Sequence, residues 1–271
     1  MKTLRSVFVV TAALVVSTAA MATSTFELYR NDPSAGACSQ VSSGNGSGMG
    51  NSYDCSAVVP GFGDELNLKA YSNSGSGSTF AAARLNDYDP SGFGVSTAGE
   101  TTSSPQHSMD NNGNLELMLF QFDSSIALSS IKAGWFSGDS DVSVLAYTGV
   151  GNAVTDLTNA TKGSLLSTGW SLVGNYLNID TNTTDINAAA ISSSYWIVAA
   201  YSDSFAGTSG YEGNDYIKLQ KVSGNFTCVN SNDPSCSPPS TGVSEPASLA
   251  LAGLALLGVV GSRRRKVSSA A

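Results

Sequence analysis

The sequence holds a single histidine, His107, in 271 residues, and this scarcity argues against much catalytic chemistry. A Ser-His-Asp hydrolase would have to use His107, which lies in a polar, turn-rich stretch without a G-x-S-x-G motif. A glycosidase could draw on paired carboxylates, but no spacing singles out one pair among the many acidic residues. We therefore expect His107 at a loop surface, no catalytic residues and no enzymatic activity.

Basic residues are also scarce once the two ends of the chain are set aside. Residues 23–244 contain 7 Lys and Arg against 20 Asp and Glu, a formal net charge of −13. Such a surface repels the phosphate backbone of nucleic acids and attracts divalent cations. We expect no nucleic-acid partner.

Long apolar runs are confined to the two ends. At the start, Lys2 and Arg5 precede the apolar stretch Val7–Val16, and Ala20 and Ala22 form an A-x-A cleavage signal. The apolar stretch is too short for a membrane span, so residues 1–22 are predicted to be a secretory signal peptide cleaved after Ala22. An uncleaved anchor is the alternative.

The second apolar run, Leu249–Gly261, is of marginal length for a membrane span. Four basic residues follow it, Arg263, Arg264, Arg265 and Lys266. Such a cluster keeps the end of the chain, residues 267–271, on the cytoplasmic side. We expect a short transmembrane helix that holds the exported chain in the inner membrane, after a Pro/Ser linker at 235–242. A permanent anchor is the alternative to transient insertion.

The order of features in this tail resembles the PEP-CTERM sorting signal of Gram-negative bacteria. Glu245 and Pro246 match the centre of the motif, and Ser244 stands where the family usually has a leading proline. The resemblance implies that residues 243–266 are recognised by an exosortase, a membrane-embedded protease-transpeptidase. It further implies tail removal and a location at the cell surface or outside the cell, often among extracellular polysaccharide.

A second stretch, Gln106–Gly149, resembles the ectodomain of exosortase-dependent surface proteins. The resemblance rests on His107-x-x-Asp110-Asn111, Phe120-Gln121-Phe122, Gly134-Trp135 and Asp139-Ser140-Asp141 before Leu145-Ala146-Tyr147. It supports the location and the fold more than any activity.

Four cysteines form two local pairs, Cys38 with Cys55 and Cys228 with Cys236. No C-x-x-C occurs and His107 is far from both pairs, so a zinc site is disfavoured. In an exported chain, disulfides are the better interpretation. Local pairing is the expectation, although the two other pairings are also compatible with the sequence.

Short alternating apolar runs separated by Gly, Ser, Asn and Asp predict a β-rich ectodomain over residues 23–234. The predicted strands cover residues 64–71, 115–122, 141–148, 176–180, 195–201 and 215–222. Residues 185–192 resemble one helical turn, with Asp185 as N-cap. The absence of βαβ alternation predicts an all-β, antiparallel β-sandwich of jelly-roll-like form.

Calcium is the most plausible cofactor. Asp87 and Asp89 occupy the first and third positions of an EF-hand-like loop, but Ala98 stands where the twelfth position needs Glu. Asp139 and Asp141 offer two more carboxylates beside a turn. Solvated turn carboxylates are the alternative for both pairs.

Three tryptophans bear on carbohydrate binding, because sugar sites often use an aromatic platform. Trp196 lies in an apolar run and is expected in the core, whereas Trp135 and Trp170 follow glycines and suit either packing or ligand binding. We expect a non-enzymatic structural protein of the surface or extracellular matrix, associated with polysaccharide. A carbohydrate-binding module at the cell surface is the alternative.

Overall fold

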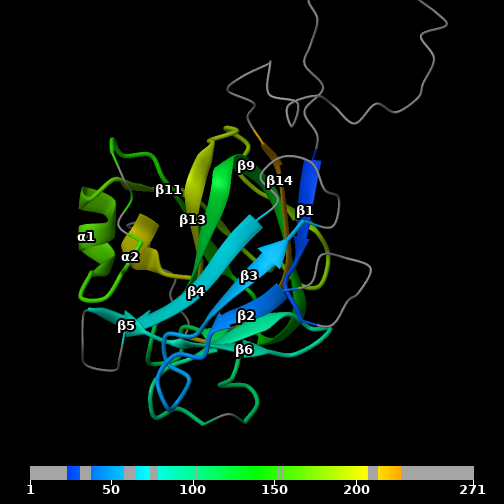
Figure 1. Cartoon of the computed structure of the whole chain (residues 1–271), viewed down its shortest axis with the longest axis vertical. Helices are drawn as coiled ribbons and strands as arrows, with labels where there is room; N and C mark the ends of the chain where they lie inside the picture. The colour runs from blue at the N-terminus through cyan, green and yellow to red at the C-terminus, as the bar shows by residue number, and fades with distance from the viewer. Residues whose placement is uncertain are drawn as a thin grey trace, which may run out of the picture. The chain divides into compact units, whose positions relative to one another are not determined.

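The computed structural model describes residues 23–30, 38–57, 65–73, 79–101, 103–151, 153, 155–206 and 213–226 (Figure 1). The predicted signal peptide, Pro/Ser linker, sorting signal and cytoplasmic tail lie outside these residues, as do Cys228 and Cys236. Within the described ranges, no helix has the length and apolar character needed to cross a membrane.

The described strands are hydrogen-bonded into a single sheet of 14 strands. In chain order they are β1 (Thr23–Glu27), β2 (Cys38–Ser42), β3 (Ser52–Ser56), β4 (Glu65–Asn73), β5 (Phe80–Ala82), β6 (Arg84–Asp87), β7 (Phe93–Ser96), β8 (Met109–Asp110), β9 (Glu116–Gly138), β10 (Val142–Tyr147), β11 (Trp170–Tyr176), β12 (Thr184–Asp185), β13 (Ser193–Ala200) and β14 (Asp215–Phe226). The pairings between these strands are antiparallel, which confirms the predicted antiparallel, β-rich class.

The long strand β9 pairs with β4, β12, β13 and β14 and so joins most of the sheet together (Figure 1). Its first part pairs with β4 along one edge, where Leu66 lies opposite Phe122. Along the other edge it pairs with β13, where Trp196 lies opposite Phe120. Its second part, from Ile126 to Gly138, pairs with β14. The N-terminal strands and the C-terminal strand therefore meet through β9.

The first and last described strands are themselves neighbours. β1 pairs with β14, so that Thr23 lies opposite Asn225, and their side chains share a 2.7 Å hydrogen bond across 202 residues of sequence. The rings of Phe26, Phe122 and Phe226 pack edge to face and join β1, β9 and β14. The first and last described strands are thus held together by backbone pairing, a side-chain hydrogen bond and aromatic packing.

Both faces of β9 are covered in its first part. Leu117 and Leu119 point to one face, Met118 and Phe120 to the other, and none of them is more than 1% exposed. Because alternate side chains of a strand point to opposite faces, a strand buried on both sides has a continuous apolar sequence. Trp196 is fully buried in the same core, as predicted.

The two helices found in the described residues were not predicted. α1 (Lys162–Ser167) begins at Thr161, whose side chain accepts a hydrogen bond from the N–H of Ser164 in a capping box. α2 (Asp203–Ala206) lies beside it at one side of the sheet (Figure 1). Both are too short to leave a 3.6-residue apolar pattern in the sequence.

Two local predictions are wrong. The helical turn at 185–192 is not formed, because Asp185 belongs to β12, and Asn187 and Ala190 have φ angles of 56° and 53°. The strand at 176–180 is also absent, since β11 ends at Tyr176 and Asn178 has a φ of 52°. Positive φ angles interrupt both helix and strand, and asparagine is among the residues that tolerate them best.

The disulfide between Cys38 and Cys55 is present and joins β2 to β3. The two cysteines are direct partners in the antiparallel register and are both buried, at 3% and 1% exposure. Local pairing is therefore confirmed for the first cysteine pair.

Candidate functional site

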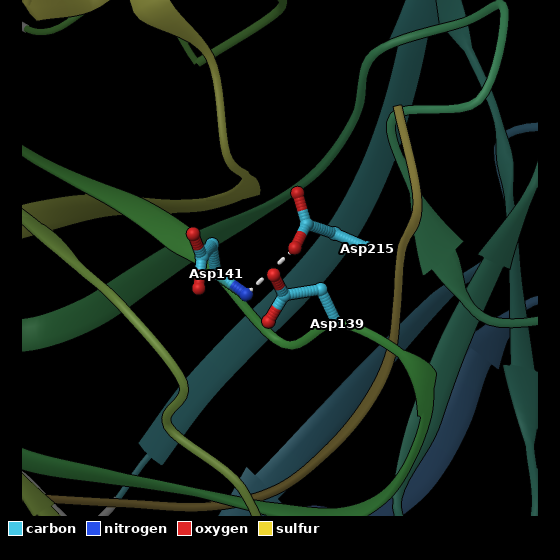
Figure 2. Close-up of side chains that lie close together, drawn as sticks. All are labelled: Asp139, Asp141 and Asp215. Carbon is cyan, nitrogen blue, oxygen red and sulfur yellow. Dashed lines mark hydrogen bonds between the residues drawn. The ribbon is translucent and has the colours of Figure 1, made fainter. Parts of the chain in front are cut away.

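Three aspartates from distant parts of the chain meet where β9 ends and β14 begins. Asp139 and Asp141 lie in the turn between β9 and β10, and Asp215 is the first residue of β14 (Figure 2). One carboxylate oxygen from each residue lies within 4.8 Å of the other two. Asp139, Asp141 and Asp215 are called the aspartate triad below.

The backbone at the end of β9 holds this turn against β14. Gly138 has a φ of 70°, and a Cβ at this position would lie 2.5 Å from the backbone oxygen of Asn214. Glycine is therefore required for the close approach. The N–H of Asp139 donates a 3.0 Å hydrogen bond to the same Asn214 oxygen. This contact sets Asp139 beside Asp215.

Hydrogen bonds fix the orientation of the carboxylates. The N–H of Asp141 donates to one oxygen of Asp215 at 2.8 Å (Figure 2), and the Asn111 amide donates to the other. The N–H of Asp215 donates in turn to the side-chain oxygen of Asn111 at 3.1 Å. The N–H of Asn178 donates to a carboxylate oxygen of Asp141 at 2.7 Å. The triad is thus anchored from four chain segments.

The three carboxylates of the triad repel one another, so a positive charge among them would stabilise this region. Asp215 is only 2% exposed, and burial raises its pKa to about 7. The charges of Asp141 and Asp139 add to the rise, while the hydrogen bonds from Asp141 and Asn111 oppose it. A proton or a cation would relieve the repulsion. Ca²⁺ favours clustered carboxylate oxygens, so the three side chains fit this ion by ligand type.

The four predicted calcium residues fall into two places. The structure brings Asp139 and Asp141 together and adds Asp215. Asp87 and Asp89 lie instead at the β6–β7 hairpin, where Asp87 is opposite Phe93. The strand β7 occupies part of the twelve residues that begin at Asp87, so this stretch forms no EF-hand loop, as Ala98 at the twelfth position already indicated. Calcium binding by Asp87 and Asp89 stays a prediction. In the described part of the chain, the triad is the one group of three metal-capable side chains.

Asp215 was missed because its proximity to Asp141 depends on tertiary structure. The two residues are separated by 74 positions, and the pairing of β9 with β14 brings them together. The available local signal was an aspartate at the start of a strand, directly after Gly213 and Asn214. That signal also fits an ordinary turn residue.

A second acidic cluster was not predicted. Asp110 and Glu116 are 1% and 0% exposed, and the N–H of Asp110 donates to a Glu116 oxygen at 3.1 Å. Burial raises the pKa of Asp110 to about 8; a hydrogen bond from Asn112 opposes the rise and the charge of Glu100 adds to it. Burial, followed by the charge of Asp110, raises the pKa of Glu116 well above its usual range. Both pKa values are therefore raised by burial, and each carboxyl favours its protonated form more than an exposed carboxyl does.

His107 lies in an aromatic cluster and not at a loop surface. It is 6% exposed, and its ring centre is 4.4 Å from Tyr88 and 6.0 Å from Trp135. Lys218 places its Nζ 4.2 Å from the Tyr88 ring centre and 4.3 Å from that of Trp135. These are cation–π distances. Trp135 is half-buried and stays a candidate ligand-binding side chain.

Trp170 does not suit the ligand-binding role predicted for it. Its side chain is 2% exposed and packs edge-on against Tyr147, with ring centres 5.7 Å apart. A sugar platform needs an accessible ring face. The structure therefore assigns Trp170 to the core, which is the alternative that its sequence position left open.

The sequence of the tail defines the class of protein, that of exported proteins sorted to the cell surface or beyond it. Residues 242–266 match the family model of the PEP-CTERM protein-sorting motif, a range that includes Glu245, Pro246 and the cluster Arg263–Lys266. The chain is thus a PEP-CTERM sorting-signal protein and an exosortase target. No curated protein and no solved structure gives a significant match to the chain.

Proposed function

We propose that this exported protein has a non-enzymatic, structural role among the extracellular polysaccharide of the cell surface. The observation that carries the proposal is the sorting motif at residues 242–266, which directs the chain to the surface. The disulfide between Cys38 and Cys55 supports it, since such bonds persist in oxidising compartments outside the cytoplasm. Removal of the signal peptide after Ala22, transient insertion in the inner membrane and a jelly-roll-like sandwich belong to the same proposal.

Calcium is the proposed cofactor of this role. The aspartate triad supports it through three oxygen donors, two from the β9–β10 turn and one from the first residue of β14. A cation there would tie the β9–β10 turn to the start of β14 and so stabilise the domain. The acidic region 23–244, with its formal charge of −13, would draw such cations from the surroundings.

A carbohydrate-binding module is the second candidate. Trp135 favours it because this indole is half-buried and not in the core, although Lys218 Nζ lies 4.3 Å from its ring centre and leaves at most the other ring face for a sugar. A binding module would show saturable affinity for a soluble glycan that falls in Trp135→Ala while the protein stays folded. A purely structural protein would bind no soluble glycan in this way.

The proposed function is tested by expressing the full chain in an exosortase-positive host and fractionating the culture. We expect the intact mass of the product to show that the tail has been removed. We also expect this processed product to co-purify with extracellular polysaccharide in the fractionation. The Glu245→Ala/Pro246→Ala variant should accumulate at full length in the inner membrane, as should a chain without Arg263–Lys266. Ser268→Ala/Ser269→Ala, beyond the basic cluster, is the control and should behave as the parent. Processed protein found wholly free of polysaccharide would contradict the structural role.

A further inference from the structure

The two arginines of the exported domain line the same cavity. Residues 23–262 contain only Arg30 and Arg84, and both border a hollow of about 710 Å³ beside the β2–β3 hairpin and β6. Tyr53, Tyr88 and Asp87 also line it. This volume lies within the range of small-molecule sites. An otherwise acidic domain thus gathers its two guanidinium groups at one place.

Arg84 is held in position by the loop that faces it. A Cβ on Gly48 would lie 3.1 Å from the Arg84 Cδ, so the backbone of this loop packs directly against the arginine side chain. The Asn45 side chain accepts hydrogen bonds from the N–H groups of Ser47 and Met49, at 2.9 and 3.0 Å. These bonds fix the loop, and the loop limits the motion of Arg84.

The floor of the cavity is equally well fixed. The amide of Asn51 is 3% exposed and bonds to both the N–H and the carbonyl of Leu85, at 2.8 and 2.9 Å. Tyr53, 4% exposed, packs against Phe93 with ring centres 4.6 Å apart. These contacts fix the parts of the cavity wall that come from β3, β6 and Asn51, so binding would order few additional groups there.

The guanidinium groups retain capacity for an anionic ligand. Arg30 makes a loose contact with Asp87, 3.9 Å between Nε and Oδ2, and its side chain is 48% exposed. Exposed ion pairs of this kind contribute little. No carboxylate lies within ion-pair distance of Arg84 in the described ranges. Lys218 adds a third positive charge 4.2 Å from the centre of the Tyr88 ring, which lines the cavity.

We propose that this cavity binds an acidic saccharide, a sugar unit that carries a carboxylate or sulfate group. Arg30 and Arg84 hold the anionic group, because the planar guanidinium matches its oxygens with paired hydrogen bonds. Side chains of Gln40, Asn45 and Ser47, which also line the cavity, meet the sugar hydroxyls. The inference rests on the proposed function, since it names the class of polysaccharide among which the protein would be retained.

The cavity is the place where an anionic group of such a polymer meets two arginines in an otherwise acidic domain. The contact is therefore electrostatic at its centre and weakens as salt screens it.

The test is isothermal titration calorimetry on the processed protein with three tetrasaccharides: tetragalacturonate, a sulfated maltotetraose and neutral maltotetraose. We expect saturable binding of at least one acidic probe and none of the neutral one. Arg84→Gln and Arg30→Gln should each weaken binding about tenfold or more, the loss expected for a charged hydrogen bond. Arg84→Lys keeps the charge but loses the planar fork, and should also weaken binding. Lys162→Gln on α1 removes the same charge away from the cavity and should bind as the parent.

Melting curves of each variant confirm that it is folded, and Arg30→Gln, at an exposed side chain, provides a readout should Arg84→Gln not fold. Binding of an acidic probe that is unchanged in the arginine variants would overturn this site but leave the polysaccharide association standing. Binding of the neutral probe alone would also overturn this site and leave the polysaccharide association standing. Binding of no probe would overturn the site, and a processed protein that also fails to co-purify with polysaccharide would remove the proposed function as well.

Discussion

The backbone N–H of Asp141 donates a 2.8 Å hydrogen bond to the carboxylate of Asp215, although the two residues carry charges of the same sign. The bond holds two acidic side chains together across 74 positions of sequence, with Asp139 close to both. Backbone donors can stabilise one carboxylate, but they do not offset the repulsion among three. The stability of this region should therefore respond to cations.

Calcium should raise the melting temperature of the protein, and chelation by EGTA should lower it. A ligand that binds only the folded state stabilises it by about 2.7 kcal/mol at a hundredfold excess over its Kd. Asp139→Asn and Asp141→Asn should each blunt the response, because each removes one charged ligand of the triad. Differential scanning fluorimetry with and without Ca²⁺ measures both effects.

Asp89→Asn is the matched control for the calcium experiment. Asp89 belonged to the other predicted calcium pair but lies in the turn of the β6–β7 hairpin, outside the triad. Its substitution should leave the calcium response intact. A melting temperature that changes with neither calcium nor chelator would contradict a role for calcium in the proposed function.

Stability should also fall as pH rises through the neutral range. Asp110 has a pKa of about 8 when folded, against about 3.9 for an unperturbed aspartate. The folded chain therefore holds a proton that the unfolded chain releases, so this stabilisation is complete below about pH 4 and lost as pH rises through about 8. We expect a lower melting temperature at about pH 9 than at about pH 5, because the proton that stabilises the folded chain is lost over this range.

Glu116→Gln should reduce the pH dependence, because the pKa of Glu116 is also raised in the folded chain and the amide that replaces it does not titrate. Thermal melts across the pH range, in EDTA to keep the aspartate triad free of metal, provide the measurement. Glu65→Gln at the exposed start of β4 is the control and should retain the parent's slope. A slope identical in the parent and Glu116→Gln would show that the buried pair does not govern it.

Loss of the Cys38–Cys55 disulfide should destabilise the domain. The bond closes a loop with a sequence separation of 17, for which the chain-entropy model gives about 3 kcal/mol. The Cys38→Ser/Cys55→Ser variant should therefore unfold at lower denaturant, with little change in the slope of the transition. Urea titration followed by tryptophan fluorescence gives both quantities. An unchanged midpoint would mean that the β2–β3 pairing alone supports this edge of the sheet.

The sequence predicted the strands whose patterns are local. Alternation around Leu66 and Leu68 located β4, and the apolar run around Trp196 located β13. It did not predict that β9 continues to Gly138, because Asp123 and several serines interrupt the apolar pattern while the backbone stays extended. Hydrogen bonds from β14, far along the chain, maintain that extension.

For the candidate sites too, the sequence predicted what depends on local patterns and missed what depends on contacts between distant segments. Asp139 and Asp141 were visible because they are two residues apart, whereas Asp215 and the arginine cavity depend on contacts between distant segments. Arg30 and Arg84 are isolated in the sequence and meet at one cavity through the packing of β1, β3 and β6. Trp170 shows the converse, since a glycine before it suggested exposure and the β10–β11 pairing buries it opposite Tyr147.

The pairing of β1 with β14 has a topological consequence for export. Thr23 follows the predicted signal-peptide cleavage point, and Asn225 precedes the linker and sorting tail, so the domain enters and leaves its sheet at one shared end. Such a domain can fold without tension while both ends are still tethered to one membrane. This contact spans nearly the whole domain, and contacts between such distant residues form slowly. If the chain is exported from its N-terminus, the β1–β14 pairing can form only after the last strand has crossed the membrane.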